Sequence, residues 1–234
     1  MNRFWNKVIL PIIKDINAKH IVEIGCFTGE NTKNILKYCT KNNAKLSAID
    51  PKPAFNIAQW NRIYKNNFSF HKDTSLNALP LIKDYDIVLI DGDHNWYTVY
   101  NELKIIEKFN INNVFPIVLL HDVAWPYARR DVYYNPNNIP NSYLHPYKKL
   151  GMVPNQSDLV EKGGINWSLN NAIYEDGSKN GVLTAVEDFF KETNMSLTFK
   201  MTDKSNGLGI IYHSNKNLDQ IIDKLLLDFA NNLG

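Results

Sequence analysis

The feature that most constrains the fold is a set of short apolar runs without polar alternation. The clearest are "DIVLID" at 86–91 and "FPIVLLHD" at 115–122. Uninterrupted apolar strands are typical of parallel sheets, because helices cover both faces of such sheets. Helical periodicity between the two runs, with Val99, Leu103 and Ile106 aligned on one side, predicts this alternating α/β arrangement.

The rest of the chain continues the pattern, with one interruption. Strands are expected at 20–25, 45–50, 68–73, 85–91, 115–122, 196–201 and 207–213, the last two forming a hairpin at the sheet edge. Helices are expected over the N-terminal segment around Pro11 and near 31–40, 97–109, 181–193 and 218–229. Residues 123–180 hold five of the ten prolines and little periodicity. We therefore expect one domain, 1–234, with an inserted binding segment or lid at 123–180.

Composition narrows the class of protein. The 26 basic and 24 acidic residues are interspersed, giving a net charge of +2, which argues against a nucleic-acid partner. No apolar run is long enough for a membrane span, and the N-terminus does not resemble a signal peptide. Cys26 and Cys39 form no disulfide framework or metal motif. A cytoplasmic protein with a small-molecule partner is expected.

A glycine turn follows the first predicted strand, in "VEIGCFTGENT" at 22–32. Gly25 and Gly29 allow a tight turn beneath a helix N-terminus, a common place for a ligand. Acidic residues end the next strands, at Asp50, Asp73 and Asp91, which suggests a crevice at this edge of the sheet. A purely structural turn, with acids that cap helices, is the alternative. Both the G-x-G-x-x-G dinucleotide motif and the Walker motif are absent.

These residues carry a family resemblance. The E-x-G-x-x-x-G turn at 23–29, Asp50, Asp73 and "LIDGDHNWY" resemble class I S-adenosylmethionine-dependent methyltransferases, over about 18–122 and the final strand pair. "DGDH" followed by "LLHD" is similar to a bacterial group related to metal-dependent sugar and macrolide O-methyltransferases. The resemblance implies a Rossmann-like, doubly wound sheet of about seven strands, mostly parallel with an antiparallel last strand. It implies S-adenosylmethionine held by Glu23, Gly25, Cys26, Gly29, Asp50, Asp73 and Asp91, with Glu23 and Gly25 near the methionine end, Asp50 on the ribose and Asp73 near the adenine.

Acids and histidines should meet where the fourth and fifth strands end. Asp91, Asp93 and His94 follow one strand, and His121 and Asp122 end the other. Carboxylates suit Mg²⁺ or Mn²⁺, and such an ion lowers the pKa of a hydroxyl. The resemblance implies metal ligands at Asp91 and Asp122 and a general base at Asp93, although His121 stands where the family usually has an acid. Two alternatives stay open: a metal-free site with His94 or His121 as base, and simple helix capping.

The inserted segment combines aromatic residues with two arginines. Trp125, Arg129 and Arg130 are expected to contact the acceptor, because aromatic rings stack on sugars and nucleobases and guanidinium groups bind anions. The same composition is typical of an interface, so a homo-oligomer is the alternative.

Together these features predict methyl transfer from S-adenosylmethionine to a hydroxyl of a saccharide, a nucleotide-linked sugar or a related metabolite. A phosphate-type oxygen is the alternative acceptor. An NAD-dependent oxidoreductase and a non-catalytic binding or assembly module are alternatives of other classes.

Overall fold

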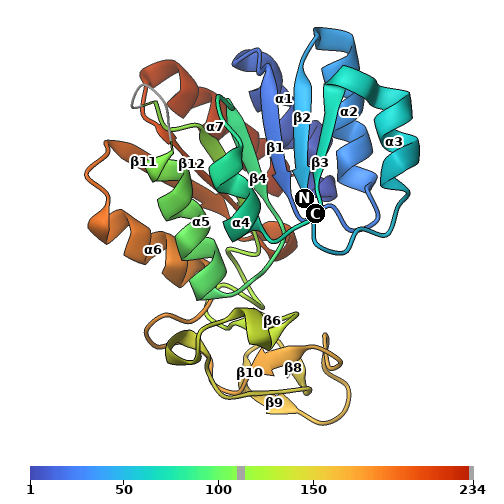
Figure 1. Cartoon of the computed structure of the whole chain (residues 1–234). Coiled ribbons are helices and arrows are strands. Elements are labelled where there is room, and N and C mark those ends of the chain that lie inside the picture. Colours follow the sequence, from blue (N-terminus) through green and yellow to red (C-terminus); the bar gives the residue numbers. More distant parts are fainter. Residues whose placement is uncertain (110–113, 232–234) are drawn as a thin grey trace.

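A computed structural model describes residues 1–109 and 114–231, and a single seven-stranded sheet forms its centre (Figure 1). The strand order is β11-β12-β5-β4-β1-β2-β3, and β12 runs antiparallel to both of its neighbours. The predicted Rossmann-like topology with an antiparallel last strand is thus confirmed. The strands are β1 (His20–Ile24), β2 (Lys45–Ile49), β3 (Phe68–His71), β4 (Ile87–Ile90), β5 (Ile117–His121), β11 (Leu197–Thr202) and β12 (Leu208–His213).

Helices cover both faces of the sheet, which explains the unalternating strands. Within β4, Ile87 and Leu89 enter one apolar core, and Val88 and Ile90 enter the other. The first core is closed by the N-terminal turns η1 (Asn2–Phe4) and η2 (Trp5–Ile9) and by α1 (Leu10–Asp15), α2 (Glu30–Asn42), α3 (Ile57–Tyr64) and α7 (Lys216–Asn231). The second is closed by α4 (Ser75–Ala78), α5 (Trp96–Lys108) and α6 (Val182–Glu192).

The inserted segment 123–180 has more regular structure than its sequence indicates. Its five short strands form a three-stranded sheet, β6-β10-β7, and a two-stranded sheet, β8-β9. They lie together beyond one end of the central sheet (Figure 1). These strands are β6 (Val132–Tyr133), β7 (Tyr147–Lys148), β8 (Gly151–Val153), β9 (Gln156–Val160) and β10 (Asn170–Ala172). The remaining short helical turns are η3 (Lys65–Asn67), η4 (Leu79–Leu81), η6 (Pro136–Asn138), η7 (Asn141–Tyr143) and η8 (Lys204–Asn206).

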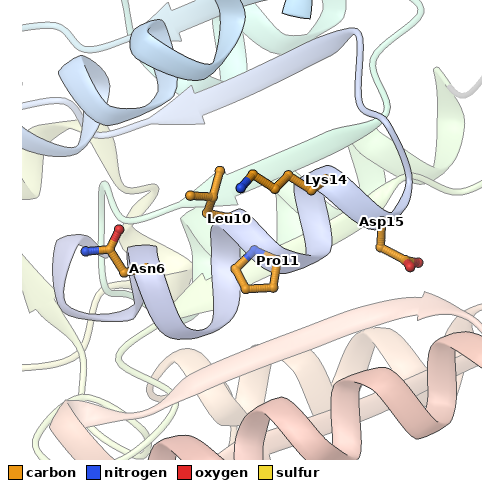
Figure 2. A pocket seen from close by; sticks show the side chains of 5 residues that line it. All are labelled: Asn6, Leu10, Pro11, Lys14 and Asp15. Atoms are coloured by element: carbon orange, nitrogen blue, oxygen red, sulfur yellow. The ribbon is translucent and has the colours of Figure 1, made fainter. Parts of the chain in front are cut away.

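A shallow depression of about 440 Å³ lies on the N-terminal helical stretch (Figure 2). Its lining residues are Asn6, Leu10, Pro11, Lys14 and Asp15, none of which lies at a strand end. Among the described residues, no helix is long and apolar enough to cross a membrane.

Candidate active site

The turn after β1 begins at Gly25, whose backbone is left-handed (φ 85°). The Gly25 amide donates to the carbonyl of Ile49 in β2 at 2.9 Å. A Cβ on Gly25 would lie 2.2 Å from the carbonyl oxygen of Asp91, which no side chain could tolerate. The sequence predicts that backbone comes close to a ligand at Gly25. In the structure, the backbone of Asp91 lies against this glycine, so the β1 turn packs on the end of β4.

Glu23 lies buried beneath this turn with unused hydrogen-bonding capacity. Its Oε1 accepts from the Asn31 side-chain amide at 2.8 Å. Glu23 Oε2 and Asn31 Oδ1 have no hydrogen-bond partner among the described residues. Burial raises the pKa of Glu23 to about 7. Buried polar atoms are rarely left unpaired in native proteins, so this pair could accept hydrogen bonds from a ligand.

Asp50, at the end of β2, holds the glycine turn in place. Its Oδ2 accepts from the amides of Cys26 (2.9 Å) and Phe27 (2.8 Å), and its Oδ1 accepts from the Lys52 amide (2.7 Å). The buried Cys26 thiol faces the carbonyl of Ile49. Among the described residues, Asp50 Oδ1 accepts only the one bond from Lys52, so it keeps the capacity for the ribose contact predicted for Asp50.

Gly29 and Asp73 have local structural partners. Gly29 is the left-handed N-cap of α2 (φ 78°), and a Cβ there would lie 2.4 Å from the Trp60 ring. Asp73 is exposed, and its Oδ1 accepts from the Asn77 side chain (3.0 Å) and the Thr74 amide (2.7 Å) at the start of α4. These bonds lower the pKa of Asp73. Both of these contacts are local and lie at the start of α4, whose N-cap is Thr74.

Asp91, His94, His121 and Asp122 form one compact group, called the four-residue cluster below, with one potential ligand atom of each within 4.8 Å of the others. His121 Nδ1 lies 2.9 Å from Asp122 Oδ2 and 3.2 Å from Asp91 Oδ1. His94 Nε2 lies 2.8 Å from Asp122 Oδ2 and 3.5 Å from Asp91 Oδ1. The Met1 amine contacts the other oxygen of Asp91, Oδ2, at 2.7 Å. The predicted convergence of acids and histidines is present for these four side chains.

The charges of the cluster shift its pKa values in opposite directions. Burial alone would raise the pKa of Asp91, but the neighbouring imidazoles of His121 and His94 hold it well below its usual range. The pKa of Asp122 is likewise lowered, because the neighbouring histidines outweigh burial. Burial would lower the pKa of His94, but the negative charge of Asp122 raises it well above its ordinary value. The cluster therefore holds its carboxylates ionised.

Asp93, predicted as the general base, lies outside the cluster. Its recorded side-chain hydrogen bond comes from the Thr98 hydroxyl at 3.4 Å, and burial raises its pKa. The capping role considered for it belongs to Asn95, whose Oδ1 accepts from the Thr98 amide at 2.9 Å. His94 and His121 are therefore better placed for proton transfer.

Glu102, which the sequence reasoning missed, is fully buried on α5. Both of its oxygens lack a hydrogen-bond partner among the described residues, and burial raises its pKa to about 8. The signal was present in the sequence: Glu102 follows Val99 by three positions on the apolar side of an amphipathic helix.

The two arginines predicted to grip an anion have partners within the protein. Arg129 makes a bidentate ion pair with Glu187 of α6, with N–O distances of 2.5 and 2.6 Å. Arg130 is only 2% exposed and donates to the backbone carbonyls of Ala172 (2.6 Å) and Ile173 (2.9 Å). Trp125, half-buried, precedes a cis proline. Arg130 therefore holds the inserted segment together and Arg129 ties it to α6, so both guanidinium groups already have anionic or carbonyl partners.

Two tyrosines of the inserted segment pack on His94 instead. The Tyr127 ring stacks on the imidazole with centroids 5.7 Å apart. The Tyr134 ring meets it edge-on, with its hydroxyl 3.4 Å from His94 Nδ1. Nearby, the buried Asp131 carboxylate accepts from the amides of Trp96 (2.7 Å) and Gly181 (2.6 Å), which are the starts of α5 and α6. The inserted segment thus fixes the loop that carries His94.

Comparison with known proteins agrees with this geometry. Residues 22–123, from β1 to just past β5, match the family model described as a methyltransferase domain. Together with the fold, this match supports an S-adenosylmethionine-dependent methyltransferase, and the matched segment contains every residue of the four-residue cluster.

Solved structures of other proteins share the fold of this chain. The Podospora anserina methyltransferase PaMTH1, solved with S-adenosylhomocysteine, aligns at 14% identity with a TM-score of 0.52, covering 87% of this chain and 75% of its own. A protein from Nostoc punctiforme described as a putative O-methyltransferase aligns at 15% identity with a TM-score of 0.52, covering 89% of this chain and 55% of its own. A search of curated proteins found no match.

Proposed function

We propose that this protein transfers the methyl group of S-adenosylmethionine to a hydroxyl of a small metabolite, with a sugar or related polyol as the favoured class. The observation that supports the proposal most is the close packing of Gly25 against the Asp91 carbonyl. This packing places a candidate cofactor site beside a candidate site for the acceptor. On one side, Glu23 Oε2 and Asn31 Oδ1 are buried acceptors without donors, suited to the ammonium group of the cofactor. On the other side lies the four-residue cluster.

In the proposed reaction the acceptor oxygen bonds to the methyl carbon as the bond from that carbon to sulfur breaks. The sulfonium becomes a neutral thioether, and the hydroxyl proton passes to Nε2 of His94 in its neutral form, which the charge of Asp122 disfavours in the ligand-free protein. This nitrogen has no hydrogen-bond partner among the described residues, although it lies close to Asp122. Tyr127 and Tyr134 hold the imidazole in place, so the protein chiefly contributes orientation and a proton acceptor.

A divalent ion fits the cluster by its chemistry. Asp91, Asp122 and His121 offer two carboxylates and an imidazole nitrogen close together, and the unpartnered His94 Nε2 faces the same group. When bound, such an ion would offset the carboxylate charge that keeps a proton on His94 and would lower the pKa of an acceptor hydroxyl.

The acceptor class rests on the inserted segment, 123–180, which we propose as the acceptor-binding lid. Tyr134 is 53% exposed beside His94, and an aromatic ring there can stack on the apolar face of a sugar. A phosphate-type acceptor is less well supported, because Arg129 and Arg130 are engaged by Glu187 and by backbone carbonyls.

The proposal is tested by measuring formation of S-adenosylhomocysteine from S-adenosylmethionine with a panel of sugars, nucleotide sugars and polyols. Replacing His94 by Gln should lower kcat by about 10²- to 10⁴-fold without weakening cofactor binding. His213→Gln is the matched control, because His213 lies at the opposite end of β12 from the residue paired with His121. A non-catalytic module would bind the cofactor and turn over none of the acceptors.

A further inference from the structure

Two exposed aromatic residues flank the same end of the β6–β10 strand pair. Tyr134 directly follows β6, and Trp167 precedes the start of β10 at Asn170 by three residues. The two strands are antiparallel, with Asn170 paired with Tyr133, so the end of β6 lies beside the start of β10. Tyr134 is 53% exposed and Trp167 is 65% exposed. Because the Tyr134 hydroxyl contacts His94, both aromatic residues belong to the surroundings of the candidate active site.

The turn that carries Trp167 is held in place by hydrogen bonds. The Leu169 amide donates to the Asn166 carbonyl at 3.0 Å, which closes the turn around Trp167. The side-chain amide of Asn171, a fully buried residue, donates to the same carbonyl at 2.9 Å and to that of Leu150 at 2.8 Å. The indole is therefore exposed on a fixed turn, and a ring held in this way loses little conformational entropy when it stacks on a ligand.

The same turn is joined to the proposed base through a tyrosine. Asn166 Nδ2 donates to the Tyr127 hydroxyl at 2.8 Å, and the Tyr127 ring stacks on His94 with centroids 5.7 Å apart. Trp167 thus follows a residue that lies one tyrosine side chain away from the imidazole. This separation suits contact with a part of the acceptor next to the ring that is methylated, rather than with that ring itself.

We propose that Trp167 determines acceptor specificity by stacking on a second sugar ring, so that the preferred acceptor contains at least two linked sugar rings. An aromatic side chain stacks on the apolar face of a sugar. The segment "INWSLN" at 165–170 carries no ionisable side chain, and its amide and hydroxyl groups suit sugar hydroxyls better than a phosphate. The inference rests on the proposed function, and it narrows the acceptor from sugars in general to glycosides of two or more rings.

The competing explanation is an interface with a second copy of the chain, in which the partner buries the indole. Aromatic residues are enriched in such interfaces. The two explanations differ in what Trp167→Ala changes. Loss of a sugar contact lowers the turnover of longer acceptors alone, whereas loss of an interface changes the oligomeric state and leaves the acceptor preference as it was.

The experiment compares acceptors that differ only in length, namely methyl glycosides of glucose, galactose and mannose and of their α- and β-linked disaccharides. In the wild type, kcat/KM for the best disaccharide should exceed that for its monosaccharide by about tenfold, the magnitude of one aromatic stack. Trp167→Ala should abolish this preference and keep kcat/KM for the monosaccharide within about twofold of the wild type, and Trp167→Phe should retain most of the preference. Tyr174→Ala is the matched control and should retain it fully, because Tyr174 is 68% exposed but follows the opposite end of β10.

Equal kcat/KM for monosaccharides and disaccharides in the wild type would overturn the proposal. An equal loss for both in Trp167→Ala would do so too, as would a change in oligomeric state alone, measured by light scattering. Binding of each glycoside is titrated calorimetrically on the same proteins with S-adenosylhomocysteine present. Turnover of no acceptor would count against the proposed function. In that case the titration still decides this inference, because disaccharide binding that is absent, or that Trp167→Ala leaves unchanged, overturns it.

Discussion

The β1 turn and the inserted segment treat their buried charges in opposite ways. Beneath the β1 turn, one carboxylate oxygen of Glu23 has no hydrogen-bond partner among the described residues. In the inserted segment, Arg130 and Asp131 are equally buried, yet backbone groups of distant strands and helices bind them. Leaving a buried polar atom unpaired lowers stability, and pairing it raises stability. We infer that Glu23 needs a ligand to complete its hydrogen bonding, whereas the buried charges of the inserted segment are already paired within the protein.

Glu102 tests whether an unpaired buried carboxyl group lowers stability. Neither of its oxygens has a hydrogen-bond partner among the described residues, and it lies on α5, away from the β1 turn. Its pKa in the folded protein, about 8, lies above the ordinary 4.5. A raised carboxyl pKa means that stability falls as pH rises from about 4.5 to 8. Glu102→Gln should remove this loss and raise the free energy of unfolding at pH 8–9 by up to about 4 kcal/mol, with little gain at pH 4. Thermal melts of both proteins across this range measure it, and parallel pH profiles would refute it.

Asp131 should behave in the reverse manner. Asp131→Ala leaves the amides of Trp96 and Gly181 without their acceptor and should lower the free energy of unfolding by about 2–3 kcal/mol. Because Asp131 fixes the start of α5 beside His94, turnover should fall while cofactor affinity stays. Urea unfolding and paired kinetics test both effects. An equal loss of cofactor affinity would show that the two regions are not separate.

Arg129 should give the smallest effect. Its ion pair with Glu187 is partly exposed, and solvent-screened pairs contribute about 1 kcal/mol or less. Arg129→Ala should therefore change stability slightly and leave the KM for the acceptor within about twofold of the wild type. A large rise in KM would instead restore the anion-binding role predicted from the sequence.

The central sheet and the residues at the carboxyl ends of its strands could be predicted, because the sequence patterns that indicate them involve neighbouring residues. Apolar runs such as 87–90 specify buried strands, and parallel strands bring their carboxyl ends to one edge by topology. Asp91 and Asp122 were expected at this edge for that reason. The unpredicted α3 did have a local signal, since Asn56 caps it by accepting from the Gln59 amide.

The remaining features depend on partners far away in the chain. Arg130 contacts residues 27 to 45 positions away, so its structural role could not be read from neighbouring residues. Asp93 and His94 are adjacent, yet only His94 joins the cluster, because the turn after β4 sends the two side chains in different directions. The small sheets of the inserted segment pair strands of two to five residues, too short for a periodic signal.

The central claim is that the unpaired Glu23 marks the cofactor site, and calorimetric titration with S-adenosylmethionine tests it most directly. The wild type should bind one cofactor per chain, and Glu23→Gln should bind it about tenfold more weakly, because a charge-assisted hydrogen bond to the ammonium group is lost. Glu161→Gln, on the exposed surface of the inserted segment, is the control and should match the wild type. Equal affinity of Glu23→Gln and the wild type would contradict the claim.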